Sequence, residues 1–364
     1  MLKTYKIQDI CVLEKGKQID TSLLDDNNPY QYINGGISAS GYYDKYNTKE
    51  NTIIVSEGGA SCGYVNFMTE KFWCGCHCYR LMEPKVKSEY LYYALKANQH
   101  GIMRLRSGCA MPNIKKSSFY NMQIKLDDNQ DNQIKVTSIL KKVTTLILKR
   151  KEQLTKIDFL VKSRFIEMFG DDCSKVNPLE KFCDFIRNGV NIKQSKDSGG
   201  YPITRIETIS NDVFNFDRLG YAGIFTLDKY ADYVLHKGDI LISHINSEKY
   251  LGRVVQYKGT QIIIHGMNLL CLRPKGSEIA TFLEYYLKSR IAKEYVSKIT
   301  KKAVNQASFS VSDYKNLPVK IVSKEKCTAF NSFIEQLDKS KFRIKKSLEK
   351  LEMTYKALLQ EYFG

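Results

Sequence analysis

The sequence lacks any run of about 18 uncharged apolar residues, so no membrane-spanning helix is expected. Its first ten residues, MLKTYKIQDI, lack the basic and then apolar layout of a secretion signal. Ten cysteines are scattered through 364 residues without such a signal, which favours reduced thiols over a disulfide framework. Because 43% of the residues are hydrophobic and can fill real cores, we expect a soluble, folded protein of the cytoplasm.

Motifs of catalysis are also missing. The five histidines stand outside any recognisable Ser-His-Asp or Cys-His set. Asn27-Asn28-Pro29-Tyr30 resembles the Asn/Asp-Pro-Pro-Tyr motif of amino-methyltransferases, but its first proline is absent, and no strand is followed by a glycine-rich cofactor loop. Asp239 and Glu248-Lys249 lack the Glu-x-Lys spacing of nucleases. We therefore predict no catalytic residues and no enzyme.

A cysteine-rich stretch, Trp73-Cys74-Gly75-Cys76-His77-Cys78, suggests a metal site at first sight. On a single strand, however, Cys74, Cys76 and Cys78 point to one face at intervals of about 6.6 Å, and His77 points to the other. Four ligands cannot converge from that arrangement. We interpret the stretch as a buried strand and predict no metal.

The glycine-rich stretch Glu57 to Gly63 is not a phosphate-binding P-loop, because it lacks the Lys-Ser/Thr step and a following helix. Two interpretations remain open. Its glycines could let backbone amides approach a phosphate or a base edge, or the stretch could be an ordinary hairpin loop.

Positive charge is abundant. The chain has 56 Lys and Arg against 39 Asp and Glu, which gives a net charge of +17. Such an excess favours a polyanionic partner, and nucleic acid before membrane, because no amphipathic surface anchor or lipidation signal accompanies it. The alternative is a set of solvated lysine faces with no such partner.

Two long helical segments of the chain share one apolar pattern. The apolar residues from Phe330 to Tyr362 follow a four-three spacing that is typical of the a/d seam of a coiled coil and is interrupted only by Lys341. Subtraction of 194 from each position gives a second seam from Val136 to Met168, in which Arg150 and Arg164 are charged. The two segments also end alike, in Phe169-Gly170 and Phe363-Gly364. We infer two copies of one unit, a globular domain followed by a long helix.

The segments before the helices repeat in the same order. Thr52 to Val55 matches Asp239 to Ile242, and Tyr90 to Lys96 matches Phe282 to Lys288. The loops between matched strands differ, as two readers of different targets would require. We predict domain 1 at residues 1–127, helix 1 at 128–172, domain 2 at 173–322 and helix 2 at 323–364, with Asp127 to Asp131 as the cap of helix 1.

Short connections then predict the topology. Domain 2 begins within roughly ten residues of the end of helix 1 and leads directly into helix 2, so the helices are most simply antiparallel. Each domain would lie at one end of the helix pair, related by a pseudo-twofold axis. About 33 helical residues give a spacer on the order of 50 Å.

The closing segment of domain 2 completes a recognisable pattern. It reads Asn305-Gln306-Ala307-Ser308-Phe309-Ser310-Val311-Ser312-Asp313-Tyr314-Lys315-Asn316-Leu317-Pro318-Val319, and its counterpart in domain 1, Met111 to Ile124, lacks the Gln and the Leu-Pro step. With the repeated seam and the Phe-Gly endings, the chain resembles over its full length the specificity subunit of a type I restriction-modification system.

The resemblance implies an α+β fold with two pseudo-repeated, β-rich target-recognition domains joined by two long antiparallel helices that form a coiled-coil spacer. It also implies a non-catalytic subunit that reads an asymmetric, bipartite target in double-stranded DNA, one half-site per domain. The implied partners are two methyltransferase subunits and, through them, restriction subunits. S-adenosylmethionine, ATP and Mg are expected on those partners, and this chain is expected to hold no cofactor.

The best candidates for DNA contacts are polar residues that we assign to loops. Arg, Asn and Gln can bond base edges, whereas Lys mostly contacts phosphate. The candidates in domain 1 are Ser38, Ser40, Tyr42, Ser61, Lys71, Arg104, Arg106, Asn113, Lys115 and Lys116. The candidates in domain 2 are Arg205, His244, Asn246, Lys249, Tyr250, Arg253, Lys301, Lys302, Asn305 and Gln306. The charged seam residues Arg150, Arg164 and Lys341 could fix the helix register or meet the partner subunits.

Two other functions stay open at this point. One is a solitary methyltransferase or nuclease fused to recognition domains, against which the missing motifs argue. The other is a coiled-coil scaffold unrelated to DNA. Salt-dependent duplex binding separates the scaffold from the DNA reader, because phosphate contacts give a steep negative slope.

Overall fold

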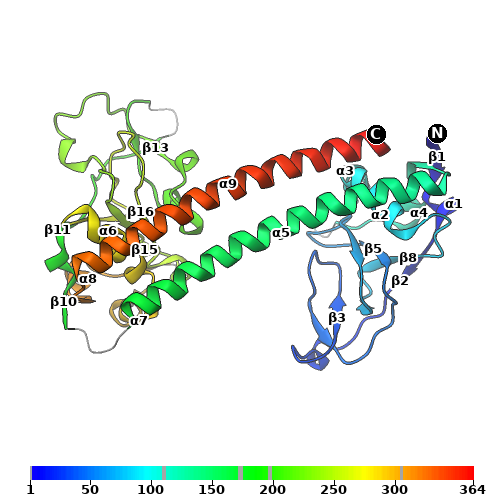
Figure 1. Cartoon of the computed structure of the whole chain (residues 1–364), viewed down its shortest axis with the longest axis horizontal. Helices are drawn as coiled ribbons and strands as arrows, with labels where there is room; N and C mark the ends of the chain where they lie inside the picture. The colour runs from blue at the N-terminus through cyan, green and yellow to red at the C-terminus, as the bar shows by residue number, and fades with distance from the viewer. Residues whose placement is uncertain (1, 109–111, 171–174, 196–198, 304–305) are drawn as a thin grey trace. The chain divides into compact units, whose positions relative to one another are not determined.

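The computed structural model of the chain describes residues 2–108, 112–170, 175–195, 199–303 and 306–364 (Figure 1). The chain folds as two compact units. Unit 1 combines the residues up to Leu154 with Arg343–Gly364, and unit 2 is Thr155–Phe342. Each unit therefore contains a globular domain, the first part of the helix that follows it and the last part of the other helix. The units thus divide each predicted helix segment between them.

Two helices of 40 residues, α5 (Gln130–Phe169) and α9 (Lys324–Phe363), carry the repeated seam. Both of their bounds are 194 residues apart, since 324 minus 130 and 363 minus 169 give that number. Their N-terminal caps are equivalent too. The Asn129 side chain accepts a hydrogen bond from the N–H of Asn132 at 3.1 Å, and Ser323 accepts one from Lys326 at 3.3 Å. Within the described residues, no helix has the length and apolarity that crossing a membrane requires.

The helices pair in the antiparallel sense within each unit, as predicted. In unit 2, Lys341 bonds to Asp158 at 2.5 Å, whereas Phe330, nearer the start of α9, packs on Phe169, nearer the end of α5. In unit 1 the later part of α9 meets the earlier part of α5, where Lys151 and Glu352 form a 3.0 Å ion pair. Residues of the two seams, such as Leu140 and Phe330, are buried in the cores of their units.

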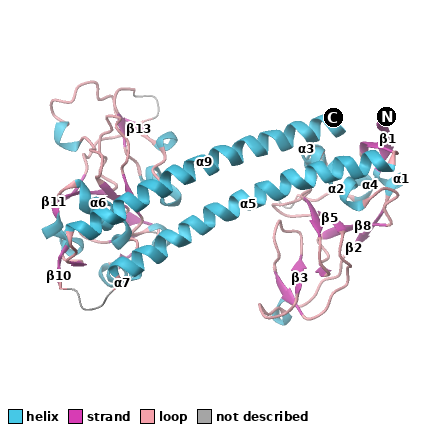
Figure 2. Ribbon diagram, in the orientation of Figure 1, coloured by secondary structure: helices cyan, strands magenta, loops and turns pink. Residues whose placement is uncertain are grey.

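Unit 1 contains one four-stranded antiparallel sheet of order β2-β8-β5-β6, a β1-β9 pair and a β4-β3-β7 sheet (Figure 2). Its strands are β1 (Leu2–Lys6), β2 (Val12–Lys15), β3 (Tyr30–Ile33), β4 (Gly41–Tyr43), β5 (Thr52–Ser56), β6 (Val65–Met68), β7 (Phe72–Cys74), β8 (Cys78–Met82) and β9 (Gln123–Asp127). Its short helices are α1 (Ile7–Ile10), α2 (Ser88–Ala97), α3 (Gln99–Arg104) and α4 (Lys116–Tyr120), with a 3-10 turn at Thr21–Leu23.

Unit 2 repeats this plan with a four-stranded sheet of order β11-β17-β14-β16 and a β10-β20 pair. Its strands are β10 (Val176–Pro178), β11 (Cys183–Asn188), β12 (Pro202–Ile203), β13 (Gly220–Tyr221), β14 (Ile240–Ile242), β15 (Ile245–Asn246), β16 (Val254–Gln256), β17 (Leu270–Pro274), β18 (Lys301–Lys302), β19 (Ala307–Ser308) and β20 (Pro318–Lys320). Its helices are α6 (Ser277–Leu287), α7 (Arg290–Ile299) and α8 (Val311–Lys315). Its 3-10 turns are Leu179–Phe182, Ile206–Asp212, Phe216–Arg218, Ala231–Tyr233 and Glu248–Tyr250.

The main sheets of the two units have the same strand order, so the repeat that the sequence predicts is also a repeat of topology. Each sheet packs against the helix that follows its last strand in the chain, α2 in unit 1 and α6 in unit 2. Leu91 of α2 and Phe282 of α6 are fully buried there. Burial of one such side chain contributes ~2 kcal/mol, and the long helices extend both cores.

One sequence prediction about unit 1 is wrong. The stretch from Trp73 to Cys78 is not one strand, because β7 ends at Cys74 and β8 begins at Cys78. Gly75 turns the chain between them, and a side chain at that position would collide with Asn34, whose amide oxygen would lie 2.3 Å from the added carbon. The argument that alternate cysteines share one strand face therefore fails.

Candidate nucleic-acid interface

A short three-stranded ladder lies next to the main sheet of unit 2. In it β19 pairs with β15 on one side and with β18 on the other, so that Ser308 lies opposite both Ile245 and Lys301. The backbone N–H of Phe309 donates to the carbonyl of His244 at 3.1 Å, and the Phe309 ring is buried. These contacts hold the ladder against the end of β14. They also position the polar side chains of the ladder at one edge of the domain.

Unit 1 contains a reduced form of the same ladder. Asn113 pairs with Gly58 on one side and with Ser107 on the other. The N–H of Ile114 donates to the carbonyl of Glu57 at 2.8 Å, which is the counterpart of the bond that anchors the ladder in unit 2. Both domains thus hold a hairpin in the same place with different side chains on it.

The glycine-rich stretch of unit 1 is a hairpin loop between β5 and β6. The N–H of Gly63 donates to the carbonyl of Ser56 at 2.8 Å, and that of Cys62 donates to Gly59 at 3.0 Å. The Gly59 N–H donates to Pro112 at 3.0 Å, so the loop also holds the ladder. These three amides already have acceptors, so the loop supports the ladder of unit 1 through the Gly59 bond.

Most of the predicted contact residues of unit 2 gather at the ladder. Asn246 lies in β15, Lys301 and Lys302 lie in β18, Gln306 directly precedes β19, and Lys249, Tyr250 and Arg253 surround the turn after β15. The Arg253 guanidinium stands 4.3 Å from the centroid of the Tyr250 ring, and the Lys249 ammonium stands 5.7 Å from it. Lys302 forms a 2.7 Å ion pair with Glu248. A cationic and aromatic cluster therefore stands at one edge of the domain.

The predicted residues of unit 1 fall into two groups. The first stands at the ladder and its flanking segments and comprises Ser61, Arg104, Arg106, Asn113, Lys115 and Lys116. The second lies around the β4-β3-β7 sheet and comprises Ser38, Ser40, Tyr42 and Lys71, of which Lys71 stands 4.8 Å from the Tyr46 ring centroid. We assigned all of these residues to loops, but Arg104 ends α3, Lys116 begins α4 and Tyr42 lies in β4.

Three predicted residues of unit 2 stand apart from the cluster. Arg205 precedes a 3-10 turn, where its guanidinium lies 3.5 Å from Glu207. Asn305 lies outside the residues that the structure describes. The prediction for His244 is wrong, because its side chain is buried beside Phe309 with 4% exposure and cannot reach a ligand on the surface. Burial lowers the His244 pKa to about 4, since the charged imidazolium would lose its hydration.

Sequence patterns missed the residues that hold the ladder of unit 1. The Glu57 carboxylate accepts a hydrogen bond from the Tyr79 hydroxyl at 2.9 Å and forms a 2.6 Å ion pair with Lys15. The same hydroxyl stands 3.1 Å from the carbonyl of Ile114. Lys15 and Tyr79 lie opposite each other in the β2-β8 pair. This pairing is the only sequence signal that could have predicted that the two side chains meet.

The exposed face of α7 was also missed. This helix buries Ala292 and leaves Arg290, Lys293 and Lys298 exposed. A Cβ atom added to Gly252 would lie 3.2 Å from a methyl carbon of Val296. Helix α7 therefore packs closely against the chain beside the Tyr250 turn. The amphipathic spacing of the helix could have shown this basic face.

The cysteines of the Trp73 to Cys78 stretch have structural partners. Cys74 and Cys78 are buried, and their thiols lie 3.7 Å from the carbonyl of Gly75 and 3.6 Å from that of Ile33. Cys76 lies 3.1 Å from the amide oxygen of Gln18, and His77 is exposed. Across the described part of the chain, no three His, Cys, Asp or Glu residues are arranged to hold a metal ion.

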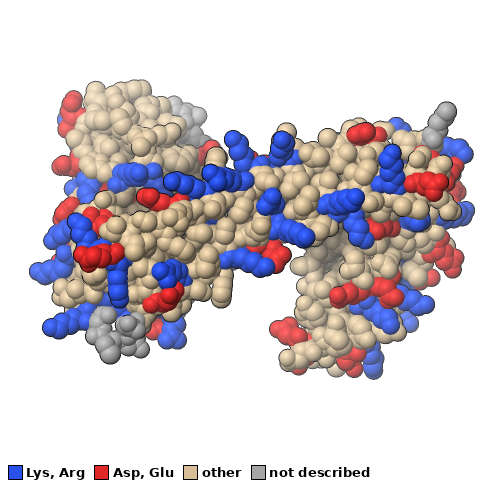
Figure 3. All heavy atoms as spheres, viewed as in Figure 1, with Lys and Arg blue, Asp and Glu red and all other residues tan. Residues whose placement is uncertain are grey.

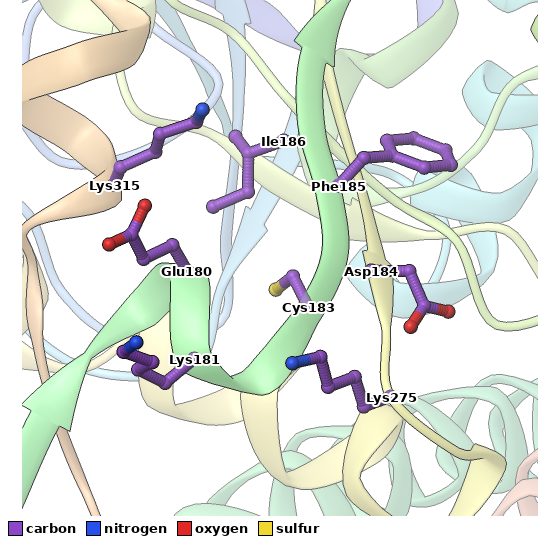
Figure 4. Close-up of a pocket in the computed structure, with 8 residues that line it drawn as sticks. All are labelled: Glu180, Lys181, Cys183, Asp184, Phe185, Ile186, Lys275 and Lys315. Atoms are coloured by element: carbon purple, nitrogen blue, oxygen red, sulfur yellow. The ribbon is translucent and has the colours of Figure 1, made fainter.

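A pocket of about 300 Å³ lies on unit 2 and is shown in Figure 4. Its lining residues are Glu180, Lys181, Cys183, Asp184, Phe185, Ile186, Lys275 and Lys315. Burial raises the pKa of the Cys183 thiol to about 12, so this group is protonated at neutral pH and is a poor nucleophile.

Lys and Arg side chains are spread along the long helices (Figure 3). Several large apolar side chains are exposed on the same helices. Leu148, Phe159 and Ile166 of α5 are 62%, 71% and 67% exposed, and Phe342 and Met353 of α9 are 64% and 71% exposed. Leu148 and Phe342 differ by 194 positions, as do Phe159 and Met353, so both repeats carry the same exposed pair. Such repetition indicates a surface with a function of its own.

Known proteins share the sequence pattern and the architecture of this chain. A family model for the type I restriction modification DNA specificity domain matches residues 2–157 and again residues 174–353. The chain belongs to this family. It is 37% identical over 191 residues to the specificity subunit of the MjaX type I restriction enzyme of Methanocaldococcus jannaschii, which is 52% of this chain and 45% of that protein. It is 36% identical over 137 residues to a type I specificity subunit of Mycoplasma genitalium, which is 37% of this chain and 36% of that protein. The chain thus spans less than half the length of the curated relatives it matches.

Solved structures of the family share the fold. The crystal structure of the S subunit of a type I restriction-modification system from M. genitalium matches with a TM-score of 0.62 at 22% identity, over 100% of this chain and 96% of that one. A chain from a structural study of the assembly and conformational transition of a type I system matches with a TM-score of 0.56 at 15% identity, over 99% and 97%. The duplicated domain and helix are therefore the architecture of the family.

Proposed function

We propose that this chain is the specificity subunit of a type I restriction-modification complex and reads an asymmetric, bipartite DNA target. Each recognition domain reads one half-site, and the paired helices set the gap between the half-sites. The chain itself carries no catalytic centre. S-adenosylmethionine, ATP and Mg bind to partner subunits. Two of these partners are methyltransferase subunits, which in turn bind the restriction subunits.

The observation that carries the proposal is one ladder built twice with different side chains. Asn113 in unit 1 occupies the position of Ser308 in unit 2. Gly58, which pairs with Asn113, corresponds to the strand residues Ile245 and Asn246 of unit 2. The anchoring bonds to Ile114 and Phe309 are the same. A constant frame with variable polar residues is what two readers of unlike half-sites need, because specificity comes from the side chains at base edges.

The charge at the ladders fits a duplex. Lys301 and Lys302 in unit 2 and Lys115 and Lys116 in unit 1 are exposed, and each can neutralise a phosphate. Asn246, Gln306 and Asn113 supply the amide groups that can bond base edges. Replacement of both Lys301 and Lys302 by Met should reduce the slope of log K against log salt by roughly 2, with equal loss on target and random duplexes. An unchanged slope would remove these lysines from the interface.

The helices have the length that a spacer needs. Forty residues at 1.5 Å each extend about 60 Å, which exceeds the ~35 Å of one DNA turn. Two domains carried at the two ends of such a pair would address half-sites on one duplex separated by a nonspecific gap.

The exposed apolar residues of the helices supply a surface for the methyltransferase subunits. Because Leu148 and Phe159 recur as Phe342 and Met353, the chain offers the same pair twice, which suits two copies of one partner. Leu148→Lys combined with Phe342→Lys should abolish co-purification of the methyltransferase while duplex binding by this chain persists. Retained co-purification would place the docking surface elsewhere.

Single-molecule sequencing of methylated bases tests the function directly. Cells that carry this chain with a methyltransferase subunit of its system are compared with cells that lack only this chain. Disappearance of a split, asymmetric motif with a fixed gap supports the proposal and gives the target. Unchanged methylation contradicts it and favours a scaffold unrelated to DNA.

A further inference from the structure

The last residue of each long helix is held by the domain of the other repeat. Phe363 ends α9 and is 3% exposed in the core of unit 1, where its ring centroid lies 5.2 Å from that of Tyr90 in α2. Phe169 ends α5 and is 6% exposed in the core of unit 2, 4.8 Å from Phe282 in α6. Tyr90 and Phe282 occupy matched positions of the repeat, so the two sockets are equivalent.

A lysine from the last strand of each domain closes the same contact. The Lys125 ammonium on β9 donates to the main-chain oxygen of Gly364 at 2.8 Å. The Lys320 ammonium on β20 donates to the carbonyl of Phe169 at 3.2 Å. A cation is favourable at a helix C-terminus, because the free carbonyls there carry partial negative charge. Each helix end is thus both inserted in a core and capped by a charge.

Tyrosines connect the capping strand to the socket. The N–H of Asp127, at the end of β9, donates to the Tyr90 hydroxyl at 3.1 Å. In unit 2 the Tyr286 hydroxyl donates to the carbonyl of Pro318 in β20 at 2.8 Å. We call these contacts joint 1, formed by Phe363, Gly364, Lys125 and Tyr90, and joint 2, formed by Phe169, Lys320, Phe282 and Tyr286.

Joint 1 is additional to the contacts that fold its domain. Strand β9 pairs with β1 along its whole length, and Ile124 and Leu126 on its inner face are buried. Lys125 lies on the outer face and is exposed. Domain 1 also contacts α5, where Leu140 is buried in the same core and Lys141 forms an ion pair with Glu89 at 3.2 Å. Joint 1 adds a contact with the end of α9 beside β9, so the domain is held on both helices.

We propose that these joints fix the angle of each recognition domain on the helix pair and so restrict the target to one gap length; the inference rests on the proposed function. One extra base pair moves a half-site by 3.4 Å and turns it by about 35° around the duplex. A domain held on both helices cannot follow that rotation, and loss of a joint removes one of the contacts that oppose it. Lys125 and Lys320 act as positioning residues that touch no base.

The test is the spectrum of gap lengths in the methylated motif of living cells, because a genome contains both half-sites at every spacing. The full-length chain is expressed with its methyltransferase as the wild type and as the variants Lys125→Met, Lys125→Arg, Phe363→Ala and Lys135→Met. Lys135→Met removes the same charge from an exposed position of α5 outside the joint. In Lys125→Met, methylation of motifs with a gap one base pair longer or shorter should rise roughly tenfold relative to the native gap, a ratio that corresponds to ~1.4 kcal/mol. Lys125→Arg and Lys135→Met should keep the single gap.

The arms of the experiment separate the two claims. A wild-type chain without a split motif overturns the proposed function and the joint with it. A wild-type chain with a split motif, together with an unchanged single gap in both Lys125→Met and Phe363→Ala, overturns the joint alone. Loss of all methylation by variants whose melting temperature is unchanged also overturns it, because the joint would then serve assembly rather than alignment.

Discussion

Two buried histidines make unit 2 sensitive to mild acid. His265 is 2% exposed and His244 is 4% exposed. Burial lowers the pKa of each imidazole from 6.5 to about 4, and in His265 the nearby Arg187 lowers it further while a bond to the Leu269 carbonyl at 2.8 Å opposes the shift. The folded state therefore holds both rings neutral, and the unfolded state protonates them first.

The sign follows from the proton balance. Above pH 7 neither state binds a proton on these rings, so they contribute no pH dependence. As the pH falls from 6.5 toward 4, the unfolded state binds more protons and the free energy of unfolding declines. With values of 6.5 unfolded and about 4 folded, each ring costs about 2 kcal/mol at pH 5, and the pair costs about 4 kcal/mol. That is a large part of the 5–15 kcal/mol that is typical of a folded domain.

Urea unfolding followed by circular dichroism at pH 7.5, 6.5, 5.5 and 5.0 measures this decline. The window ends at pH 5 because Asp and Glu begin to titrate below it. His265→Gln keeps a donor for the Leu269 carbonyl and should remove about half of the decline. His100→Gln replaces an exposed histidine of α3 and serves as the matched control. Equal free energies of unfolding at pH 7.5 and 5.0, within about 1 kcal/mol, would refute the reasoning that burial keeps these rings neutral.

Three further predictions concern stability. Asp239 is 1% exposed and receives two 2.8 Å bonds from Arg273, so Asp239→Asn should lower the free energy of unfolding by about 3 kcal/mol in a urea titration, and a loss below ~0.5 kcal/mol would contradict a structural role. Asn129→Ala and Ser323→Ala remove equivalent helix caps, so thermal unfolding should show a cost of about 1 kcal/mol for each, and a large difference between them would show that the repeats are not energetically equivalent. Lys341→Met breaks an ion pair with the exposed Asp158 and should change the free energy of unfolding by less than about 1 kcal/mol. Leu140→Ala in the buried seam should lower it by about 3 kcal/mol, and equal effects of the two variants would contradict this distinction.

Periodic features could be predicted from the sequence because they depend on local spacing. The seam from Phe330 to Tyr362 and its copy from Val136 to Met168 predicted two long helices, and the helices α5 and α9 carry those residues. The matched segments around Thr52 and Asp239 predicted the repeated sheet, whose strand order recurs in the two units. Such features repeat every two, three or four residues, so the pattern itself reports the face that is buried.

Contacts between distant segments were beyond the reach of sequence patterns. Trp73 to Cys78 contains apolar and small residues that favour a strand, yet the approach of Asn34 makes a turn at Gly75. His244 follows a strand and is polar, which is typical of a loop residue, but the packing of Phe309 buries it. The ladder unites Gly58 with Asn113, and this pairing depends on long-range hydrogen bonds that no local spacing encodes.

The distribution of differences between the repeats has a physical explanation. Helix caps, helix ends and capping lysines recur, as in Asn129 and Ser323 or Lys125 and Lys320, because each supports a frame that both domains use. At the ladder only backbone bonds recur, since any residue can make them, and the side chains are free to differ. A backbone-anchored hairpin therefore lets a half-site change without loss of the frame. The same logic limits change at the joints, where one weakened contact would alter the gap and with it every target that the complex recognises.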